Sequence, residues 1–375
     1  MNSKEKKHKI FIVVGRLGER LTVSKITPFT HSDLVEKVFV FAETEWKPLD
    51  KTVYITHPIW TKKIKYKLFK KVFRFIFEPC QLIYYSLKHR PFLINGVYTL
   101  PKGLYSVIAS KIARTNVVVS IIGEIPETIS ISRRFKFFWK KVNIWIYKNA
   151  DILTTKGIMI KDYLIKKGIK GSKIEILNGA IETIHEQKDK DNKDIDILFV
   201  GNFSSLKGPD RVIDMIELLI KKYNYKHIKA VFLGDGPLFN FINHYIHQKN
   251  LTQNVILKGY VSNVLDYYSR TKVLVMPSTS EGLSTAMLEA MSGRCVPVVS
   301  NVGNMTDAAH HNCNSYVVDN YNDIPLFTKY INKLLSDEKL RKSFAVKGEE
   351  MVKNNYTVKP QSLIVNKIID ILQSR

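Results

Sequence analysis

Short apolar runs alternate with amphipathic helical segments along the chain, and this alternation limits the fold more than any other feature. Strands that alternate with helices are typical of parallel sheets built from βαβ units. The candidate strands of the first half are residues 9–14, 37–43, 52–56, 92–98, 116–123, 151–155 and 173–177. Those of the second half are residues 196–201, 228–234, 254–260, 272–277 and 296–300. The sequence therefore predicts an α/β fold with two Rossmann-like parallel-sheet domains.

The chain has 375 residues, which is more than one hydrophobic core usually holds. A polar stretch at residues 181–196, IETIHEQKDKDNKDID, has few apolar residues and predicts a linker. We therefore expect an N-terminal domain over residues 1–183 and a C-terminal domain over residues 194–357. Residues 323–357 and the last piece, 358–375, indicate helices.

The sequence also lacks the marks of several protein classes. No run of eighteen apolar residues is present, so we expect no membrane span. The apolar run after the basic N-terminus is too short for a signal peptide, and we expect a first strand there. Three scattered cysteines fit a reducing cytosol. No CxxC, HExxH or paired-histidine motif is present, so we expect no metal and no other cofactor.

The formal net charge of +24 is concentrated in the first half of the chain. Residues 1–190 contain 36 Lys and Arg against 16 Asp and Glu, whereas the remainder contains 22 against 18. Such an asymmetry indicates an anionic partner, either nucleic acid or anionic lipid. A lysine-rich genomic composition would give the same excess without any partner.

Two segments of the first half, residues 61–77 and 133–148, combine an apolar helical stripe with many basic residues. Basic amphipathic helices with aromatic residues bind the interface of anionic membranes. The alternative is that both stripes face the protein core and that the lysines are merely solvated. Two such helices in one domain favour membrane contact. The candidate membrane residues are Lys70, Lys71, Arg74, Arg133, Arg134, Trp139 and Lys140.

Four glycine-containing turns follow candidate strands of the second half: FVGNFSSLKG, VFLGDGP, VILKGYV and VLVMPSTSEG. Ligands of open parallel sheets bind beyond the carboxyl ends of the strands, so we expect the four turns to form one site. Lys207 and the N–H groups of a helix start suit an anion there.

The stretch from Ser280 to Ser300 places one glutamate before a Gly-Leu-Ser turn and a second inside the following helix. Gly282 permits close backbone approach to a ligand, and Ser284 or Thr285 can cap the helix. A helix start suits a phosphate, and the carboxylates of Glu281 and Glu289 accept hydrogen bonds from hydroxyl groups. A phosphate beside hydroxyls describes a sugar nucleotide.

These motifs together resemble family 4 of the GT-B fold glycosyltransferases, the retaining enzymes of capsule, exopolysaccharide and lipopolysaccharide assembly. The family pattern runs G-R-x(4)-K-G, G-x-G-P, strand-G and P-S-x-x-E-G-x(6)-E-A-x-x-x-G-x-P-V-V. This chain has VGNFSSLKG, LGDGP, LKGYV and PSTSEGLSTAMLEAMSGRCVPVVS in that order. The resemblance covers residues 196–300 well and the first half more loosely.

The resemblance implies a role for each matching residue. Glu281 would hold donor-sugar hydroxyls, Glu289 the ribose hydroxyls, and Lys207 the diphosphate, with Glu281 and Lys207 central to catalysis. The base would lie near Gly259 and Tyr260. The acceptor would bind the first domain across a cleft, and residues 358–375 would pack on that domain. The implied donor-binding residues are Gly201, Asn202, Lys207, Gly234, Gly259, Tyr260, Glu281, Gly282, Leu283, Ser284 and Glu289.

The sequence departs from the family pattern at several positions. Asn202 stands where the family usually has a diphosphate-binding arginine, a loss that Arg211 or Arg294 would have to offset. The Gly-Gly loop after the first strand is replaced by GRLGER, in which Gly15 and Arg16 remain to contact phosphate or acceptor. Lys102 occupies a position that is often histidine, and no catalytic base is assigned.

Together, these features predict a retaining glycosyltransferase on the cytoplasmic face of the membrane. Its partners would be a UDP- or GDP-sugar, a lipid-linked saccharide of a surface polysaccharide and anionic lipid. A nucleotide-sugar epimerase on the same fold is a rival, but no set of acids and bases for it is found in the first half. A nucleic-acid binder is a second rival. In such a protein the aromatic residues should lie among the lysines, whereas here they lie along the apolar stripe. A non-catalytic sugar-nucleotide binder is the third, because Asn202 replaces an arginine.

Overall fold

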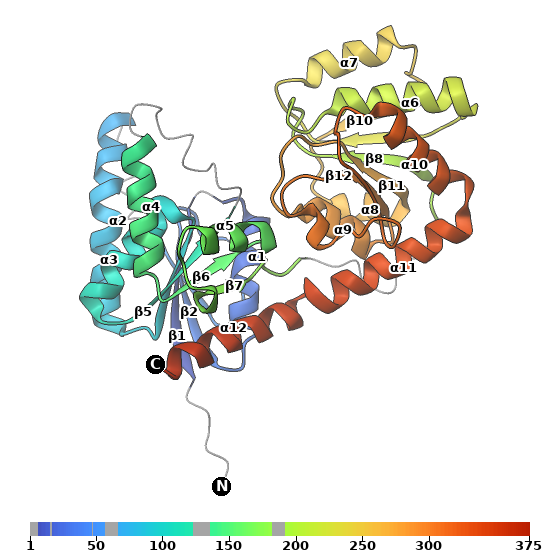
Figure 1. The fold of residues 1–375 in the computed structure, drawn as a ribbon. Coiled ribbons are helices and arrows are strands. Elements are labelled where there is room, and N and C mark those ends of the chain that lie inside the picture. Colours follow the sequence, from blue (N-terminus) through green and yellow to red (C-terminus); the bar gives the residue numbers. More distant parts are fainter. Residues whose placement is uncertain (1–6, 16, 47, 57–66, 123–135, 182–191) are drawn as a thin grey trace. The chain divides into compact units, whose positions relative to one another are not determined.

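The computed structural model describes residues 7–15, 17–46, 48–56, 67–122, 136–181 and 192–375. The chain forms two compact units (Figure 1). Each unit encloses its own hydrophobic core. Unit 1 comprises Met1–Ala180 and Val358–Arg375, and unit 2 comprises Ile181–Thr357.

Unit 1 is built on a sheet of seven parallel strands in the order β3-β2-β1-β4-β5-β6-β7. The strands are β1 (His8–Val13), β2 (Val35–Phe41), β3 (Thr52–Ile55), β4 (Leu93–Val97), β5 (Asn116–Ile121), β6 (Ile152–Thr155) and β7 (Ile174–Ile176). Its α-helices are α1 (Glu19–Thr30), α2 (Lys67–His89), α3 (Leu104–Ala113), α4 (Lys136–Asn149), α5 (Ile158–Lys166) and α12 (Val358–Gln373).

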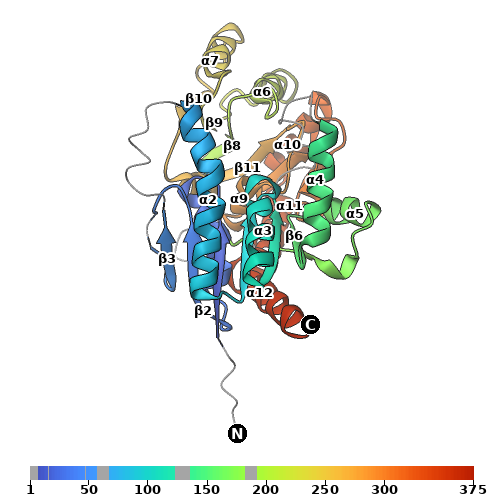
Figure 2. The same ribbon diagram turned by 90° about the vertical axis from the view of Figure 1, so that its left-hand side faces the viewer.

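Both faces of this sheet are buried, which explains why the strands are almost continuously apolar. Ile10 and Ile12 of β1 pack into a cluster with side chains of α1 and α12. Phe11 and Val13, which point to the other face, pack with side chains of α2 and α3. Helices α2, α3 and α4 lie side by side on that second face (Figure 2).

Unit 2 is a parallel sheet of six strands in the order β10-β9-β8-β11-β12-β13. The strands are β8 (Ile195–Val200), β9 (Ala230–Leu233), β10 (Val255–Gly259), β11 (Thr271–Met276), β12 (Val296–Ser300) and β13 (Tyr316–Val318). The helices are α6 (Pro209–Tyr223), α7 (Phe239–Gln248), α8 (Val264–Arg270), α9 (Thr285–Ser292), α10 (Ile324–Ser336) and α11 (Glu338–Asn355). Two core clusters, one on each face, bury the sheet.

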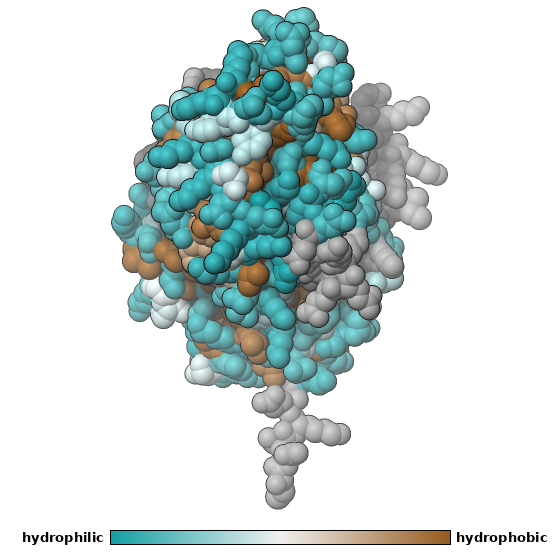
Figure 3. Space-filling view, turned by 90° about the vertical axis from the view of Figure 1, so that its right-hand side faces the viewer, coloured by the Kyte–Doolittle hydropathy of each residue, from teal (hydrophilic) through white to brown (hydrophobic). Residues whose placement is uncertain are grey.

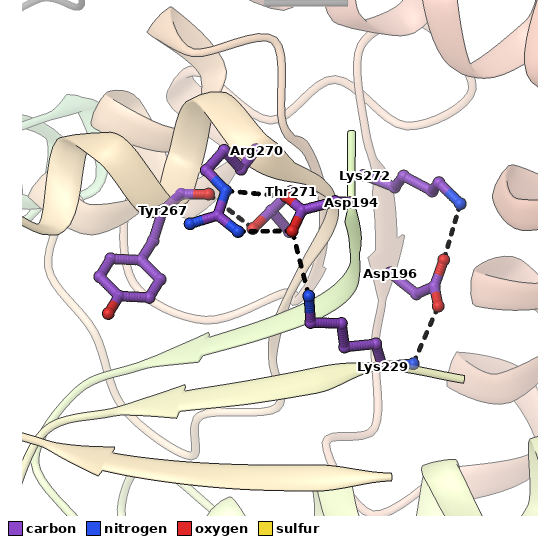
Figure 4. Close-up of polar contacts among 7 residues, drawn as sticks. All are labelled: Asp194, Asp196, Lys229, Tyr267, Arg270, Thr271 and Lys272. Carbon is purple, nitrogen blue, oxygen red and sulfur yellow. Dashed lines mark hydrogen bonds and ion pairs between the residues drawn. The ribbon is translucent and has the colours of Figure 1, made fainter. Parts of the chain in front are cut away.

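An ionic network lies at the amino ends of the unit 2 strands (Figure 4). Asp194 accepts a hydrogen bond from Arg270 Nε at 2.8 Å and pairs with Lys229 Nζ at 3.0 Å. Asp196 pairs with Lys272 Nζ at 2.7 Å. The hydrogen bond from Arg270, supported by Lys229, holds the pKa of Asp194 well below its usual range. The network therefore ties the starts of β8, β9 and β11 together.

Exposed large hydrophobic side chains are concentrated in unit 1 among the described residues. Eight of them lie on the three adjacent helices α2, α3 and α4: Phe75, Ile76, Tyr84, Leu87, Ile108, Ile112, Phe138 and Trp145. The face of the molecule seen in Figure 3 is by contrast mostly hydrophilic, with hydrophobic side chains in small separate spots. None of the helices in the described ranges is long and apolar enough to cross a bilayer.

Candidate functional site

Four loops follow the adjacent strands β8, β9, β10 and β11, so they share the carboxyl edge of the unit 2 sheet. They are loop A (residues 201–208), loop B (234–238), loop C (260–263) and loop D (277–284). In an open parallel sheet this edge is where ligands bind. The four glycine turns of the sequence are thereby brought together.

Backbone hydrogen bonds tie these loops into one frame. Phe203 N of loop A donates to Asp235 O of loop B at 2.9 Å, and Gly234 N donates to Gly259 O, just before loop C, at 2.8 Å. Thr279 N of loop D donates to Leu206 O of loop A at 2.8 Å. The loops therefore position one another.

Two positions in loop B require glycine because of close backbone approach. A Cβ on Gly234, whose φ is +131°, would lie 1.9 Å from the carbonyl oxygen of Gly201. A Cβ on Gly236 would lie 2.6 Å from the Asn202 side-chain oxygen. Loop B thus packs directly against loop A, with Asn202 at the contact.

Lys207 and Glu281 form an ion pair that joins loop A to loop D. Ser278 Oγ donates a second hydrogen bond to the same carboxylate oxygen of Glu281 at 2.9 Å. The side chain of Glu281 is 9% exposed and that of Lys207 28% exposed. The two residues predicted to be central to catalysis are therefore in contact, and Lys207 keeps access to solvent.

Helix α9 begins directly after loop D with its amino end at the same edge of the sheet. Ser284 is its N-cap and accepts a hydrogen bond from Met287 N, which confirms the predicted capping role. The amino end of a helix favours anions. Glu289 lies in the second turn and is buried, so it does not occupy a solvated position of the helix. Leu283 is also buried, in the core cluster beneath the loop.

Arg211 contacts the backbone of two of the loops. Its Nε donates to Pro277 O at 3.0 Å and its Nη2 to Ser205 O at 3.1 Å. The guanidinium also lies over the ring of Tyr321, at 5.2 Å from its centroid. Arg211 therefore holds loop A against loop D, with two of its donors already engaged by carbonyl groups.

Arg294 lies just after the last turn of α9, so the length of that helix separates it from Ser284 at the other end. It donates from Nε to Glu349 at 2.7 Å. The structure does not bring Arg294 to the loops that contain Asn202, so it does not offset the missing arginine there.

The remaining predicted donor and phosphate residues are placed as follows. Gly259 ends β10 with a φ of +66°, and the next residue, Tyr260, is 82% exposed. Gly15 follows β1 in unit 1, and a Cβ there would meet no atom within 4 Å. Arg16 lies outside the described residues. Tyr260 therefore offers a free aromatic face at the ligand edge of unit 2.

The predicted membrane residues fall on two helices of unit 1. Lys70, Lys71 and Arg74 belong to the first turns of α2, and their side chains lie outside the described part of the structure. Arg133 and Arg134 lie outside the described residues as well. Lys140 is exposed on α4 and Trp139 is half-buried. The apolar stripe of α4 is only partly buried, because Ile146 faces the core whereas Phe138 and Trp145 are exposed.

Sequence reasoning missed Ser278 and Gly236. Ser278 orients Glu281, and its only signal was a hydroxyl residue three positions earlier in the same loop. Gly236 was visible as the second glycine of LGDGP, but its contact with Asn202 depends on the folded loops. Within the described ranges, no cluster of three His, Cys, Asp or Glu residues suits a metal ion.

Comparisons with known proteins agree with this geometry. Residues 180–351 match the family model of the glycosyl transferases group 1. The chain is 26% identical over 294 residues to the capsular polysaccharide biosynthesis glycosyltransferase CapM of Staphylococcus aureus, covering 72% of this chain and 74% of CapM.

A second relative is the N-acetylgalactosamine-N,N'-diacetylbacillosaminyl-diphospho-undecaprenol 4-alpha-N-acetylgalactosaminyltransferase of Campylobacter jejuni. It is 28% identical, over 56% of this chain and 57% of the relative. Among solved structures, Anabaena HepE in complex with UDP-glucose superposes with a TM-score of 0.73 at 14% identity, covering 98% of this chain and all of HepE. The predicted GT-B fold class is thereby confirmed.

Proposed function

We propose a reaction for this chain, whose residues 180–351 match the family model of the group 1 glycosyl transferases. The protein transfers a sugar from a nucleotide-diphosphate sugar to a lipid-linked saccharide, with retention of anomeric configuration. The product is part of a surface polysaccharide. The observation that carries the proposal is the Lys207–Glu281 pair beside the amino end of α9.

This pair supplies both kinds of recognition that a sugar nucleotide requires. An ammonium group and the first N–H groups of α9 attract a diphosphate. Carboxylate oxygens accept hydrogen bonds from sugar hydroxyls. When the donor binds, Lys207 turns from Glu281 to the diphosphate, and the released carboxylate of Glu281 takes hydroxyl groups of the sugar. Ser278 keeps that carboxylate in place during the exchange.

The proposed transfer needs no separate base. The bond between the anomeric carbon and the diphosphate oxygen breaks, and the acceptor oxygen bonds to that carbon on the same face. A diphosphate oxygen takes the proton of the acceptor hydroxyl. Lys207 and the α9 N–H groups stabilise the negative charge that develops on the leaving diphosphate. No metal or other cofactor takes part in this scheme.

The lipid-linked acceptor and the membrane location rest on other observations. The Campylobacter relative is named for a diphospho-undecaprenol-linked substrate, and CapM is named for capsular polysaccharide. The exposed hydrophobic side chains of α2, α3 and α4 are accompanied by lysines: Lys111 lies over Trp145 at 6.0 Å and Lys88 over Tyr84 at 5.8 Å. Aromatic residues with neighbouring cations suit an anionic interface. We place the protein at the inner face of the cytoplasmic membrane.

The donor site is tested by thermal unfolding with UDP, GDP, ADP or no nucleotide. A ligand at about 100 times its Kd adds roughly 2.7 kcal/mol to the free energy of unfolding, which is a shift of several degrees. We expect one nucleotide to raise the unfolding temperature of the wild type and of Glu349→Ala, but not that of Glu289→Ala. Glu349, in α11, pairs with Arg294 just beyond the last turn of α9. If no nucleotide shifts the wild type, the proposal fails.

A further inference from the structure

The ion pair between Lys207 and Glu281 already occupies both of the side chains that the proposed donor would bind. The carboxylate of Glu281, whose side chain is only 9% exposed, also accepts a hydrogen bond from Ser278 Oγ at 2.9 Å. Ser278 is itself buried. The free protein therefore holds its lysine against an internal anion, and an incoming diphosphate has to replace that anion.

The loops around this pair supply no further cation. Loops A to D contain one basic residue, Lys207, against two acids, Asp235 and Glu281. Arg211, at the start of α6, already donates to two backbone carbonyl groups. The N–H groups at the start of α9 attract an anion, but the loops themselves have a formal charge of the wrong sign for one. A diphosphate at this edge of the sheet therefore depends on Lys207 turning toward it.

Separating the pair has a different cost for a ligand with a sugar than for a ligand without one. When Lys207 turns away, the carboxylate of Glu281 keeps Ser278 as its remaining hydrogen-bond donor within the described residues. A nearly buried charged group that loses its partner is destabilised. Sugar hydroxyls donate to this carboxylate and offset the loss, whereas a nucleoside diphosphate brings no sugar hydroxyl to it.

We propose that Glu281 competes with the diphosphate for Lys207, so that a ligand satisfies both residues only if it brings sugar hydroxyls as well. Glu281 thereby favours the sugar-bearing donor over the nucleoside diphosphate that remains after transfer, and Ser278 sets the strength of this preference. Once the sugar has left, Glu281 pairs with Lys207 again and promotes release of the nucleoside diphosphate. The inference rests on the proposed function, because it takes the ligand to be a nucleotide sugar.

The test is isothermal titration calorimetry of the full-length protein with UDP, GDP and ADP. Glu281→Gln should bind its nucleoside diphosphate at least about fivefold more tightly than the wild type, because an amide competes poorly for Lys207. Ser278→Ala should bind it about twofold or more weakly, because Glu281 then loses both donors when Lys207 leaves. A merely structural role of these two residues would weaken binding in both variants, so the opposite signs are diagnostic.

The preference for the sugar is measured with a panel of UDP- and GDP-hexoses. The affinity of the best-bound sugar nucleotide, relative to that of its nucleoside diphosphate, should fall about tenfold or more in Glu281→Gln. Asp196→Asn is the matched control, because it also converts an ion-paired carboxylate of unit 2 to an amide, at the amino ends of the strands. It should bind every ligand as the wild type does.

Circular dichroism establishes that each variant is folded, and Ser278→Ala keeps the test decisive if Glu281→Gln is not. Binding of the nucleoside diphosphate by Glu281→Gln that is no tighter than that of the wild type overturns the inference. So does wild-type or tighter binding by Ser278→Ala, or an unchanged preference for the sugar nucleotide. In these cases the donor site still stands. If no nucleotide binds either the wild type or Glu281→Gln, the donor reaction itself fails, and the inference fails with it.

Discussion

Replacing Lys207 by methionine tests the central pair of the donor site. Methionine retains an apolar stem where that of Lys207 lies against Gly201, but it removes the ammonium group. Loss of one group that stabilises the leaving charge lowers kcat by about 100- to 1000-fold, or about 2.7–4 kcal/mol of transition-state energy. We expect a loss of this size in the rate of sugar transfer.

The same substitution leaves Glu281 largely buried without its cation, although Ser278 still donates to it. An unpaired buried polar group costs about 1–3 kcal/mol of unfolding free energy. Glu281→Gln should cost less than about 1 kcal/mol, because Lys207 is more exposed and water can solvate it. Urea unfolding of the apo protein measures this asymmetry, and transfer from a radiolabelled donor measures the rate.

Lys272→Met is the matched control. Lys272 is 29% exposed and pairs with Asp196 at 2.7 Å, near the amino ends of the strands of the same sheet. Lys272→Met should lower the free energy of unfolding by about as much as Lys207→Met does. It should lower the rate of sugar transfer by no more than about twofold. Equal turnover in Lys207→Met and Lys272→Met would refute the assignment of Lys207 to the leaving group.

Three further results are expected. Gly234→Ala should destabilise the protein by about 2 kcal/mol or more and abolish nucleotide-dependent stabilisation, because the new Cβ meets the Gly201 carbonyl oxygen; a wild-type melting temperature would contradict this. Asp194 has a lowered pKa, so its contribution is present above about pH 4 and is lost as the pH falls. Asp194 is exposed, so Asp194→Asn should cost less than about 1 kcal/mol at pH 7, and this cost should shrink progressively as the pH falls below about 4, as pH-dependent denaturation curves will show. Phe138→Ser with Trp145→Ser should weaken flotation with anionic vesicles severalfold and leave that with zwitterionic vesicles unchanged, whereas Phe241→Ser in unit 2 should behave as wild type.

The strands of this fold were readable because both faces of each sheet are buried. All twelve predicted strands are present, and the thirteenth, β13, was missed because only three residues form it at the sheet edge. The predicted linker was too long by two residues, since β8 begins at Ile195. The helical stripe predicted over residues 61–77 covers only the first part of α2, because the helix continues through Pro79 to His89.

At the donor site, spacing predicted which loops meet but not what their side chains do there. Lys207 and Glu281 are 74 positions apart, and their contact follows from the adjacency of β8 and β11. The engagement of Arg211 by two carbonyl groups, and the separation of Arg294 from the loops, depend on three-dimensional placement. No local pattern encodes either fact.

Helix α12 has a consequence for the order in which the protein folds. Its residues Val365, Ile368, Ile369 and Leu372 complete the core of unit 1, although they are synthesised after all of unit 2. Unit 2 is continuous in the chain and holds its own core residues when Thr357 leaves the ribosome. Domains usually fold from the N-terminus during synthesis. In this chain the second unit is ready to fold while the first still exposes the apolar face that α12 will cover.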